Sequence, residues 1–503
     1  MKNILIHEIF EPIEKAGFKA WFVGGCVRDQ LMGVTPHDFD ICTNAKPADL
    51  HKIFTKFSNV SGNSEPFGVT IVLVPLNERE HTMMEVEIAT LRRDITKGRH
   101  PKIEFTDSVK EDAMRRDFTV NALFETSKGE IIDPTGFGIP DCENKLLRFV
   151  GDPQERISED PLRIFRFVRF LASKGFTSAH QIRSTLDWKA DFEDVSKERI
   201  LKELEKTFAG KFLFTRDSQG FRPWDFFLST RVANRIGMAE VMVDMVNITQ
   251  SLKWHAEGST WQDSNGVTKA GELITDFTDF QPVANGNVFD HVIRVMENMS
   301  TLVAESDEHK RFIMMMAAFL HDIGKTIPEG EKTDTWIHNG QKVEETIPVV
   351  HKHDVIGAPM ALDFCKKLGM SNDDSEFVSE LTRLHMKMHQ LTKIKSRFAM
   401  LKLTNHPFFN DIVTLAKADE SACIKTVDDE WIGVEQALKV PLASECVGVP
   451  MPKPLVTGDD LIAVGRKPGP EFKKLLEIGM KLQIDQNQKK ESILKQLKNM
   501  PPM

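Results

Sequence analysis

Residues 21–47 read WFVGGCVRDQLMGVTPHDFDICTNAKP, and this stretch decides the fold of the N-terminal part of the chain. The pattern predicts a strand that runs into Gly24 and Gly25, followed by a short helix over residues 27–32. Glycines at such a turn let a ligand approach the backbone closely, and the start of a helix offers N–H groups to a phosphate. Arg28, one turn into the helix, is within reach of the same anion. We therefore expect this turn to bind phosphate.

Two carboxylates, Asp38 and Asp40, follow the predicted helix. In an extended segment, residues i and i+2 share a face. Two carboxylates side by side suit two Mg²⁺ ions, which prefer octahedral oxygen coordination and bridge substrate phosphates. Paired metals can activate an attacking hydroxyl and stabilise the leaving oxygen in an in-line displacement. A lone Asp-x-Asp is commonly a solvated loop and a lone Gly-Gly a simple turn, but their order and spacing here favour a catalytic site.

The composition narrows the class of protein. A length of 503 residues corresponds to about three domains. The net charge of −9 excludes a uniformly basic nucleic-acid binder but not a local basic face. The six cysteines show no CxxC spacing, so we expect no disulfide scaffold. The chain start and the absence of long apolar runs predict neither a signal peptide nor a membrane span, and we expect a cytoplasmic protein.

Residues 159–170 read EDPLRIFRFVRF and predict a helix over residues 161–174. Asp160, Arg163 and Arg166 recur at three-residue steps, so we expect them on one helix face. Asp accepts a hydrogen bond from an amino group, and Arg donates to a ring nitrogen and a carbonyl oxygen. Such a pair can read the Watson–Crick edge of cytosine or adenine without a template. The alternative is a salt-bridged amphipathic helix.

Three further motifs occur in the order expected of one family: RRDFTVNALF at 115–124, SKERILKEL at 196–204 and LVTGDDLIAVGRKPGPEF at 455–472. With the two stretches above, the chain resembles the class II tRNA nucleotidyltransferases and bacterial poly(A) polymerases, which are polymerase-β-like nucleotidyltransferases. The resemblance implies that Asp38 and Asp40 are catalytic and hold Mg²⁺, and that Asp160 and Arg163 select the base. It implies a nucleotide site of Gly24, Gly25, Arg28, Arg115, Arg116, Asp160, Arg163, Arg166 and Arg169.

Two details of the resemblance stay open. One of Arg115 and Arg116 is expected to contact the triphosphate, whereas the other can pair only with Glu111 or Asp112. A loop bearing Gly, Lys and Arg resembles the flexible loop with which the family switches to the terminal A, and it carries Lys97 where the family often has Asp.

A third carboxylate could come from Glu85 and Glu87, which share a face of a predicted strand. A structural or surface role is the more ordinary one for such charges.

A second candidate site lies in residues 288–425, which we expect to be a helical block rich in histidine. His321 and Asp322 are adjacent at the end of an apolar helix, and further His and Asp residues lie on separate predicted helices. Such a set can hold a metal with mixed nitrogen and oxygen ligands. The set resembles the HD phosphohydrolase superfamily, which implies a metal site of His291, His321, Asp322 and Asp419.

The same resemblance implies that His353 and His385 hold a second metal or a phosphate. Imidazole with carboxylate suits Ni, Mn or Fe, or Mg²⁺ more weakly. A bound metal would make a hydroxide nucleophile or polarise a phosphoryl oxygen. Family members with a fused HD domain act on phosphomonoesters and 2′,3′-cyclic phosphates. For His351 and His389 a core or surface role is the ordinary expectation.

Basic residues gather in two segments despite the negative net charge. Residues 381–410 contain six Lys or Arg and no Asp or Glu, and residues 462–503 contain nine basic and four acidic residues. Such patches suit RNA phosphates, although each alone can be a solvated helix face. The family grips tRNA with its body and tail, which implies RNA binding by Lys393, Lys395, Arg397, Lys473 and Lys474.

The predicted fold class is α+β. We expect a polymerase-β-like head with a mixed sheet and helices, followed by an all-α neck, a body with the HD domain, and a tail. The expected limits are 1–140 for the head, 141–253 for the neck and nucleotide-reading helices, 254–287 for a linker, 288–446 for the HD domain and 447–503 for the RNA-binding tail. Nothing in the sequence indicates an oligomeric state.

The predicted function is template-independent addition of CCA to tRNA 3′ ends from CTP and ATP, with HD phosphatase or cyclic phosphodiesterase activity on RNA ends. One alternative is a poly(A) polymerase or an enzyme that adds only CC or A. Another is an HD phosphohydrolase whose head binds RNA without catalysis. A pure RNA-binding scaffold fits poorly with two complete metal sets.

Overall fold

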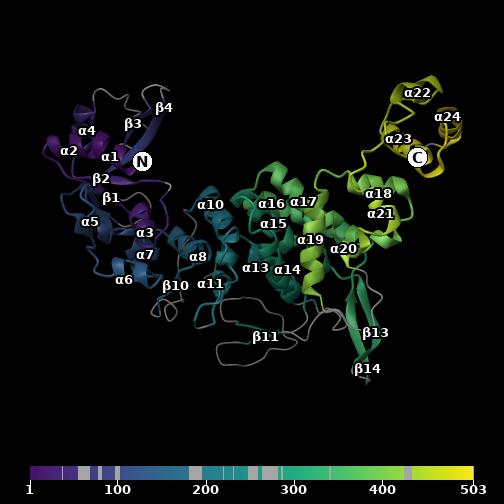
Figure 1. Ribbon diagram of the computed structural model, residues 1–503. Helices are drawn as coiled ribbons and strands as arrows, with labels where there is room; N and C mark the ends of the chain where they lie inside the picture. The colour runs from purple at the N-terminus through teal and green to yellow at the C-terminus, as the bar shows by residue number, and fades with distance from the viewer. Residues whose placement is uncertain are drawn as a thin grey trace. The chain divides into compact units, whose positions relative to one another are not determined.

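The chain folds into two compact units, Met1–Ile236 and Gly237–Met503 (Figure 1). The computed structural model describes residues 1–36, 38–54, 68–77, 82–96, 102–179, 195–218, 220–229, 232–246, 248, 259–262, 281–284, 287–338, 341–423 and 433–501. The loop position Lys97 and most of the expected linker 254–287 lie outside the described residues.

A six-stranded mixed sheet forms the centre of the first unit, in the order β3-β4-β2-β1-β7-β8. Strands β2 and β4 pair in parallel, and the other neighbours pair antiparallel. The expected mixed sheet is thereby confirmed. Its strands are β1 (Ala20–Val23), β2 (Ile41–Thr43), β3 (Val69–Asn77), β4 (Thr82–Thr90), β7 (Phe124–Glu125) and β8 (Ile131–Ile132).

The sheet is buried because β1 carries apolar side chains on both of its faces. All four residues of β1 are buried, and the Phe22 ring lies 4.5 Å from that of Phe10. Phe10 belongs to an amphipathic N-terminal helical stretch made of α1 (Lys2–Leu5), η1 (Ile6–Phe10) and α2 (Glu11–Lys15). The smaller elements of the head are α3 (Gly25–Leu31), α4 (Pro47–Ile53), β5 (Arg92–Asp94), β6 (Ile103–Phe105), α5 (Val109–Met114), η3 (Thr119–Asn121) and α6 (Gly138–Glu143).

Helices follow the sheet and pack through aromatic side chains. Helix α8 (Leu162–Lys174) buries Phe167 and Phe170 against Phe118 and packs on α10 (Lys197–Phe208). The predicted helices over 161–174 and 197–208 are confirmed, the first beginning one residue later than expected. The neighbouring elements are β9 (Leu146–Leu147), α7 (Pro153–Glu159), β10 (Thr177–Ser178), α11 (Pro223–Ser229) and α12 (Val232–Arg235).

Antiparallel helices build the second unit. Helix α14 (Val288–Leu302) packs on α19 (Phe409–Ala422), and α16 (His353–Leu368) packs on α17 (Asn372–His389). The apolar helix α15 (Glu308–Leu320) buries every residue from Phe312 onward. The remaining elements of this part are α13 (Met238–Val246), η4 (Ile323–Thr326), η5 (Leu391–Lys393), α18 (Arg397–Thr404), α20 (Val434–Ala437) and α21 (Pro441–Ser444).

Three short helices close the chain around a small core of their own. Helices α22 (Gly458–Ala463), α23 (Glu471–Gln486) and α24 (Lys490–Asn499) bury Leu461, Leu475 and Ile493. Thr457 begins α22 with a capping box to Asp460. None of the described helices is long and apolar enough to cross a membrane.

The expectation of an all-helical chain beyond the head is wrong at three places. Strands β13 (Gly330–His338) and β14 (Gln341–Val349) form a long hairpin between η4 and α16, seen in Figure 1 below the helices of this unit. Strands β11 (Ser259–Gln262) and β12 (Gln281–Ala284) pair inside the expected linker, and β9 pairs with β10.

Candidate active sites

The glycine turn brings one carboxylate and one arginine together. Gly24 precedes α3 with φ 72° and ψ −122°, and the Val23 amide donates to the Asp40 carbonyl at 3.0 Å. A Cβ atom at Gly24 would lie 3.5 Å from Arg116 Nη1 and 3.9 Å from Asp40 Oδ2. The turn, the acid and the guanidinium therefore meet at the end of β1, as the sequence predicted for Asp40.

Replacing Gly24 by Ala is expected to destabilise the first unit by about 1–3 kcal/mol, because an L side chain rarely adopts this backbone conformation. Thermal unfolding of the full chain measures the effect. The matched control is Gly25→Ala, where a Cβ atom would meet Arg28 Nη2 at an ordinary 3.6 Å. Equal stability of the two variants would contradict this account of the turn.

Asp38 is close enough to affect the ionisation of Asp40. Burial raises the pKa of Asp40, and the neighbouring Asp38 carboxylate raises it further, whereas Arg116 and Arg28 lower it. The two neighbouring carboxylates form an oxygen-only donor set, which fits Mg²⁺.

Arg28 and Arg116 are held by the segment around η3. Arg28, only 5% exposed, donates from Nη1 to Asn121 Oδ1 at 2.6 Å, and its guanidinium lies over the Phe170 ring at 5.0 Å. Arg116 donates to the Asn121 carbonyl at 3.4 Å. Both cations are thus fixed beside the carboxylates.

Arg115 and Arg116 share one buried carboxylate. Asp112 accepts from Arg115 Nε at 2.8 Å and from Arg116 Nη2 at 2.9 Å. Burial opposes ionisation of Asp112, but the two arginines hold its pKa below the usual value. Both arginines therefore pair with Asp112, one of the two acids expected as a partner. Arg116 is the one that also reaches the glycine turn.

Asp160 does not lie on the same helix face as Arg163, contrary to the prediction. Asp160 has extended backbone at φ −144° and ψ 101°, and α8 begins only after Pro161. Proline disfavours helical backbone for the residue before it, which explains the shift. Asp160 Oδ1 instead accepts from the Leu162 amide at 3.2 Å, and Oδ2 pairs with Arg199 at 3.0 Å.

Arg163 joins three parts of the first unit. Its guanidinium donates to the Arg156 carbonyl, to Glu159 Oε2 and to the Arg115 carbonyl, each at 2.8 Å. The hydrogen bond to the Arg115 carbonyl connects α8 to the segment that carries Arg116.

Arg166 and Arg169 are paired with buried acids. Arg166 Nη2 lies 2.6 Å from Asp117 Oδ2, and Arg169 Nε lies 3.0 Å from Glu203 Oε2 on α10. Glu203 belongs to the motif at 196–204 and holds Arg169 of α8 in place, which gives this motif a structural role.

Asp117 should stabilise the first unit in a pH-dependent way. Burial disfavours the ionised form, but Arg166, Asn121 and the Phe118 amide lower the pKa of Asp117 to about 2 from 3.8. The stabilisation is complete above pH 4 and is lost as the pH falls through 2. We expect Asp117→Asn to cost about 2 kcal/mol at pH 7 and progressively less between pH 4 and pH 2.

Urea unfolding of wild type and Asp117→Asn across this pH range tests the prediction, with the exposed Asp107→Asn as a control. A difference in the free energy of unfolding that does not shrink toward pH 2 would contradict it.

The second site gathers the predicted histidines and aspartates at the centre of the second unit. His291, His321 and Asp419 form one group, and Asp322, His353 and His385 form another, each with ligand atoms within 4.8 Å of one another. Asp322 belongs to the second group and also contacts the first. Its Oδ2 is 3.3 Å from His321 Nε2, and its Oδ1 is 3.3 Å from His353 Nε2. The geometry offers two adjacent metal positions bridged by one carboxylate.

Backbone carbonyls orient two of these imidazoles. His321 Nδ1 lies 2.8 Å from the Ala318 carbonyl, and His385 Nδ1 lies 2.7 Å from the Thr382 carbonyl. A carbonyl accepts only an N–H, so Nδ1 of each ring carries a proton and Nε2 faces the cluster. Burial, together with the His321 charge, lowers the pKa of His385 to about 3, so His385 is neutral at pH 7. Neutral imidazoles with carboxylates fit a divalent metal.

Two further residues belong to this site and were not predicted for it. His389 Nε2 lies 2.8 Å from Asp419 Oδ2, a hydrogen-bonded position that is compatible with the expected core role and that also places His389 beside the histidine cluster. Lys325 Nζ lies 2.7 Å from Asp322 Oδ2. Burial opposes ionisation of Asp322, but Lys325 and His321 hold its pKa well below the usual value.

Comparison with known proteins finds a family match around each candidate site. Residues 20–148 match the poly A polymerase head domain, and residues 288–422 match the HD domain. The two matches cover separate parts of the chain. Asp38 and Asp40 lie in the range that matches the head domain, and the histidine cluster lies in the range that matches the HD domain.

Curated relatives match part of the chain. The CCA-adding enzyme of Lactiplantibacillus plantarum is 40% identical over 204 residues, which cover 40% of this chain and 48% of that enzyme. The CCA-adding enzyme of Geobacillus kaustophilus is 37% identical over 207 residues, or 41% and 49% of the two chains. The chain thus spans about half the length of the curated relatives it matches.

Solved structures show the same fold over nearly the whole chain. The Bacillus stearothermophilus CCA-adding enzyme in complex with CTP has a TM-score of 0.57 at 22% identity, covering 99% of this chain and 97% of that one. The Thermotoga maritima CCA-adding enzyme complexed with tRNA has a TM-score of 0.53 at 15% identity, covering 98% and 94%. The expected α+β fold class is confirmed.

The remaining candidates lie at the surface. Glu85 and Glu87 are exposed on β4 of the head. Outside the HD cluster, His351 is exposed, as are Lys393, Lys395, Lys473 and Lys474. Arg397, the fifth residue expected to bind RNA, pairs with Glu445 at 2.8 Å.

Proposed function

We propose that this protein completes tRNA 3′ ends by adding C, C and A from CTP and ATP without a template. The observation that carries the proposal is the meeting of Asp40 and Arg116 at the Gly24 turn, with the Asp38 charge acting on Asp40, in the range that matches a poly A polymerase head domain. The curated relatives that match part of the chain are named CCA-adding enzymes, which supports tRNA, CTP and ATP as partners.

In the proposed reaction the RNA 3′-hydroxyl attacks the α-phosphate of the nucleotide and pyrophosphate leaves. The Gly24 turn admits the triphosphate, and Arg28 and Arg116 face its negative charge. Mg²⁺, held by Asp38 and Asp40, would supply activation of the hydroxyl and stabilisation of the leaving oxygen.

Base selection is proposed for Asp160 and Arg163. Their side chains now bind Arg199 and Glu159, so reading a base requires both to exchange these partners for the base edge. Arg166 and Arg169 are held rigid by Asp117 and Glu203 and would border the nucleotide.

A second activity is proposed for the HD domain: hydrolysis of phosphomonoesters or 2′,3′-cyclic phosphates at RNA ends. The two ligand groups bridged by Asp322 support it. The mixed donor set suits Ni, Mn or Fe, or Mg²⁺ more weakly. Removing such groups from a damaged 3′ end would leave the hydroxyl that the head needs.

We also propose the five-domain division into 1–140, 141–253, 254–287, 288–446 and 447–503, and a cytoplasmic location, where uncharged tRNA is processed. The head match at 20–148 and the HD match at 288–422 support two of these domains.

A tRNA that lacks its CCA end tests the proposed function when it is incubated with CTP alone, ATP alone or both. We expect two added nucleotides with CTP alone and three with both. A long ladder with ATP alone would identify a poly(A) polymerase. Addition of only C or only A when both nucleotides are present would identify a partial enzyme. Hydrolysis of a cyclic phosphate without any incorporation would favour the HD phosphohydrolase alternative.

A further inference from the structure

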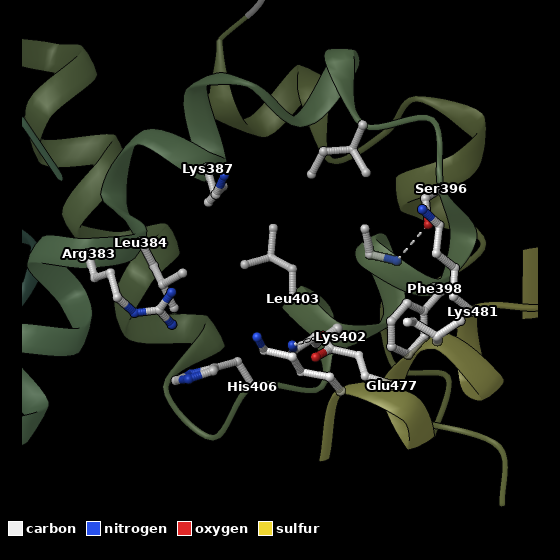
Figure 2. Close-up of a pocket in the computed structure, with 14 residues that line it drawn as sticks. Arg383, Leu384, Lys387, Ser396, Phe398, Lys402, Leu403, His406, Glu477 and Lys481 are labelled. Atoms are coloured by element: carbon white, nitrogen blue, oxygen red, sulfur yellow. Dashed lines mark hydrogen bonds and ion pairs between the residues drawn. The ribbon is translucent and has the colours of Figure 1, made fainter. Parts of the chain in front are cut away.

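A pocket of about 670 Å³ lies between α17, α18 and α23 in the second unit (Figure 2). Buried apolar side chains, among them Leu384, Phe398 and Leu403, line its inside. Five cations surround them: Arg383, Lys387, Lys402, Lys474 and Lys481. The pocket thus combines an apolar hollow with a strongly basic border.

The fold does not use all of these cations. Arg383 pairs with Glu380 and Lys402 with Glu477. Lys387, Lys474 and Lys481 are exposed, and none of them forms an ion pair with another described residue. Positive charges gathered without partners repel one another, and an anionic ligand would relieve that repulsion.

The spacing of the lysines suits an extended anion. Lys474 and Lys481 are seven residues apart on α23, which places their Cα atoms about 10 Å apart along the helix axis. Figure 2 shows Lys387 on the other side of the pocket, with Leu403 between it and Phe398. A compact anion would leave the hollow empty, and a wholly apolar ligand would leave the lysines unpaired.

We infer that this pocket binds an unpaired nucleotide of an RNA substrate, with the base in the hollow and the backbone phosphates on Lys387, Lys474 and Lys481. Proteins bind single-stranded RNA by this combination of cations along the backbone and apolar or aromatic surfaces for the bases. The inference rests on the proposed function and adds a base-binding site in the second unit. An acidic segment of a partner protein is the competing occupant.

Binding of tRNA without added nucleotides tests the role of the lysines. We expect the double variant Lys474→Ala/Lys481→Ala to raise the Kd about tenfold and to reduce the slope of log Kd against log salt by about 1.4, or 0.7 for each charge. The matched control removes two exposed lysines that lie outside the pocket and outside both basic segments, Lys366→Ala/Lys439→Ala, and should change the Kd less than threefold. Equal losses in the two variants, or no loss in either, would overturn the inference.

A second variant tests the hollow without changing any charge. Ala399, exposed on α18, lines the pocket, and Ala399→Leu would fill part of it. We expect weaker binding of a single-stranded RNA, by about fivefold, with the salt slope unchanged and with duplex RNA bound as by wild type. Unchanged single-strand binding would contradict base insertion.

Competition decides the occupant. Labelled RNA oligonucleotide is displaced either by unlabelled RNA or by a poly-glutamate peptide of the same charge. If the peptide displaces it as well as unlabelled RNA does at the same concentration, the pocket is assigned to an acidic partner instead. These measurements use no CTP or ATP, so they can fail while tRNA incorporation succeeds. A wild type that binds RNA here but adds no nucleotide would overturn the proposed function and leave the inference standing.

Discussion

Asp40→Asn is expected to lower nucleotide incorporation into tRNA by about a thousandfold. Asp40 lies at the Gly24 turn beside Arg116, and with Asp38 it supplies the oxygen donors proposed for Mg²⁺. The amide keeps the size of the side chain but removes the charge that holds the metal. A thousandfold decrease in the rate of incorporation corresponds to the loss of several kcal/mol of transition-state stabilisation.

Single-turnover incorporation of labelled CTP measures the effect. The matched control is Asp49→Asn, another acid of the head, whose side chain is half-buried on α4 and pairs with Lys52 at 3.5 Å. It should retain full activity. Hydrolysis by the HD domain should be unchanged in both variants, which shows that the chain is folded. Incorporation by Asp40→Asn within tenfold of wild type would contradict the assignment.

The second large effect concerns Asp322, which bridges the two ligand groups of the HD domain. Asp322→Asn should lower hydrolysis of a 2′,3′-cyclic phosphate by about a thousandfold, because one carboxylate serves both groups and the amide weakens both. Calorimetric titration with Mn²⁺ should show weaker binding in the second unit.

The control is Asp363→Asn, a surface acid of α16 that pairs with Lys367. It should bind Mn²⁺ and hydrolyse as wild type does, and both variants should add nucleotides at the normal rate. Hydrolysis at the wild-type rate by Asp322→Asn would contradict the proposed phosphohydrolase activity of this site. Loss of incorporation in Asp322→Asn would instead show that the substitution damages the fold.

The sequence predicted the main elements where periodicity and turn residues agree. The strand before Gly24 and the helix α10 (Lys197–Phe208) follow from apolar spacing alone. The carboxylates Asp38 and Asp40 were placed by motif order, and the structure brings Asp40 to the turn. Local pattern sufficed here because β1 is a short apolar run that is buried on both faces and α10 is amphipathic.

Other features depended on partners far apart in the sequence. Asp160 was assigned to a helix because its spacing to Arg163 fits, but Pro161 sets the backbone before it. His389 follows His385 by one helical turn, a spacing common in helix cores, and only the fold shows that it reaches Asp419.

The hairpin of β13 and β14 was missed although the sequence carries its signal. Residues 338–341 read HNGQ between two runs rich in Thr, Val and Ile, and Asn-Gly is the strongest short hairpin signal. The many histidines on either side of this segment indicate a continuous helical block, and this indication outweighed the local hairpin signal in the prediction.

The central claim is that the head adds a defined CCA end, and sequencing the 3′ ends of tRNA after incubation with CTP and ATP tests it most directly. The account predicts that a tRNA lacking its end grows by C, C and A and then stops, and that Asp40→Asn leaves it unchanged. Tails of many adenosines, or equal growth with Asp40→Asn, would contradict it.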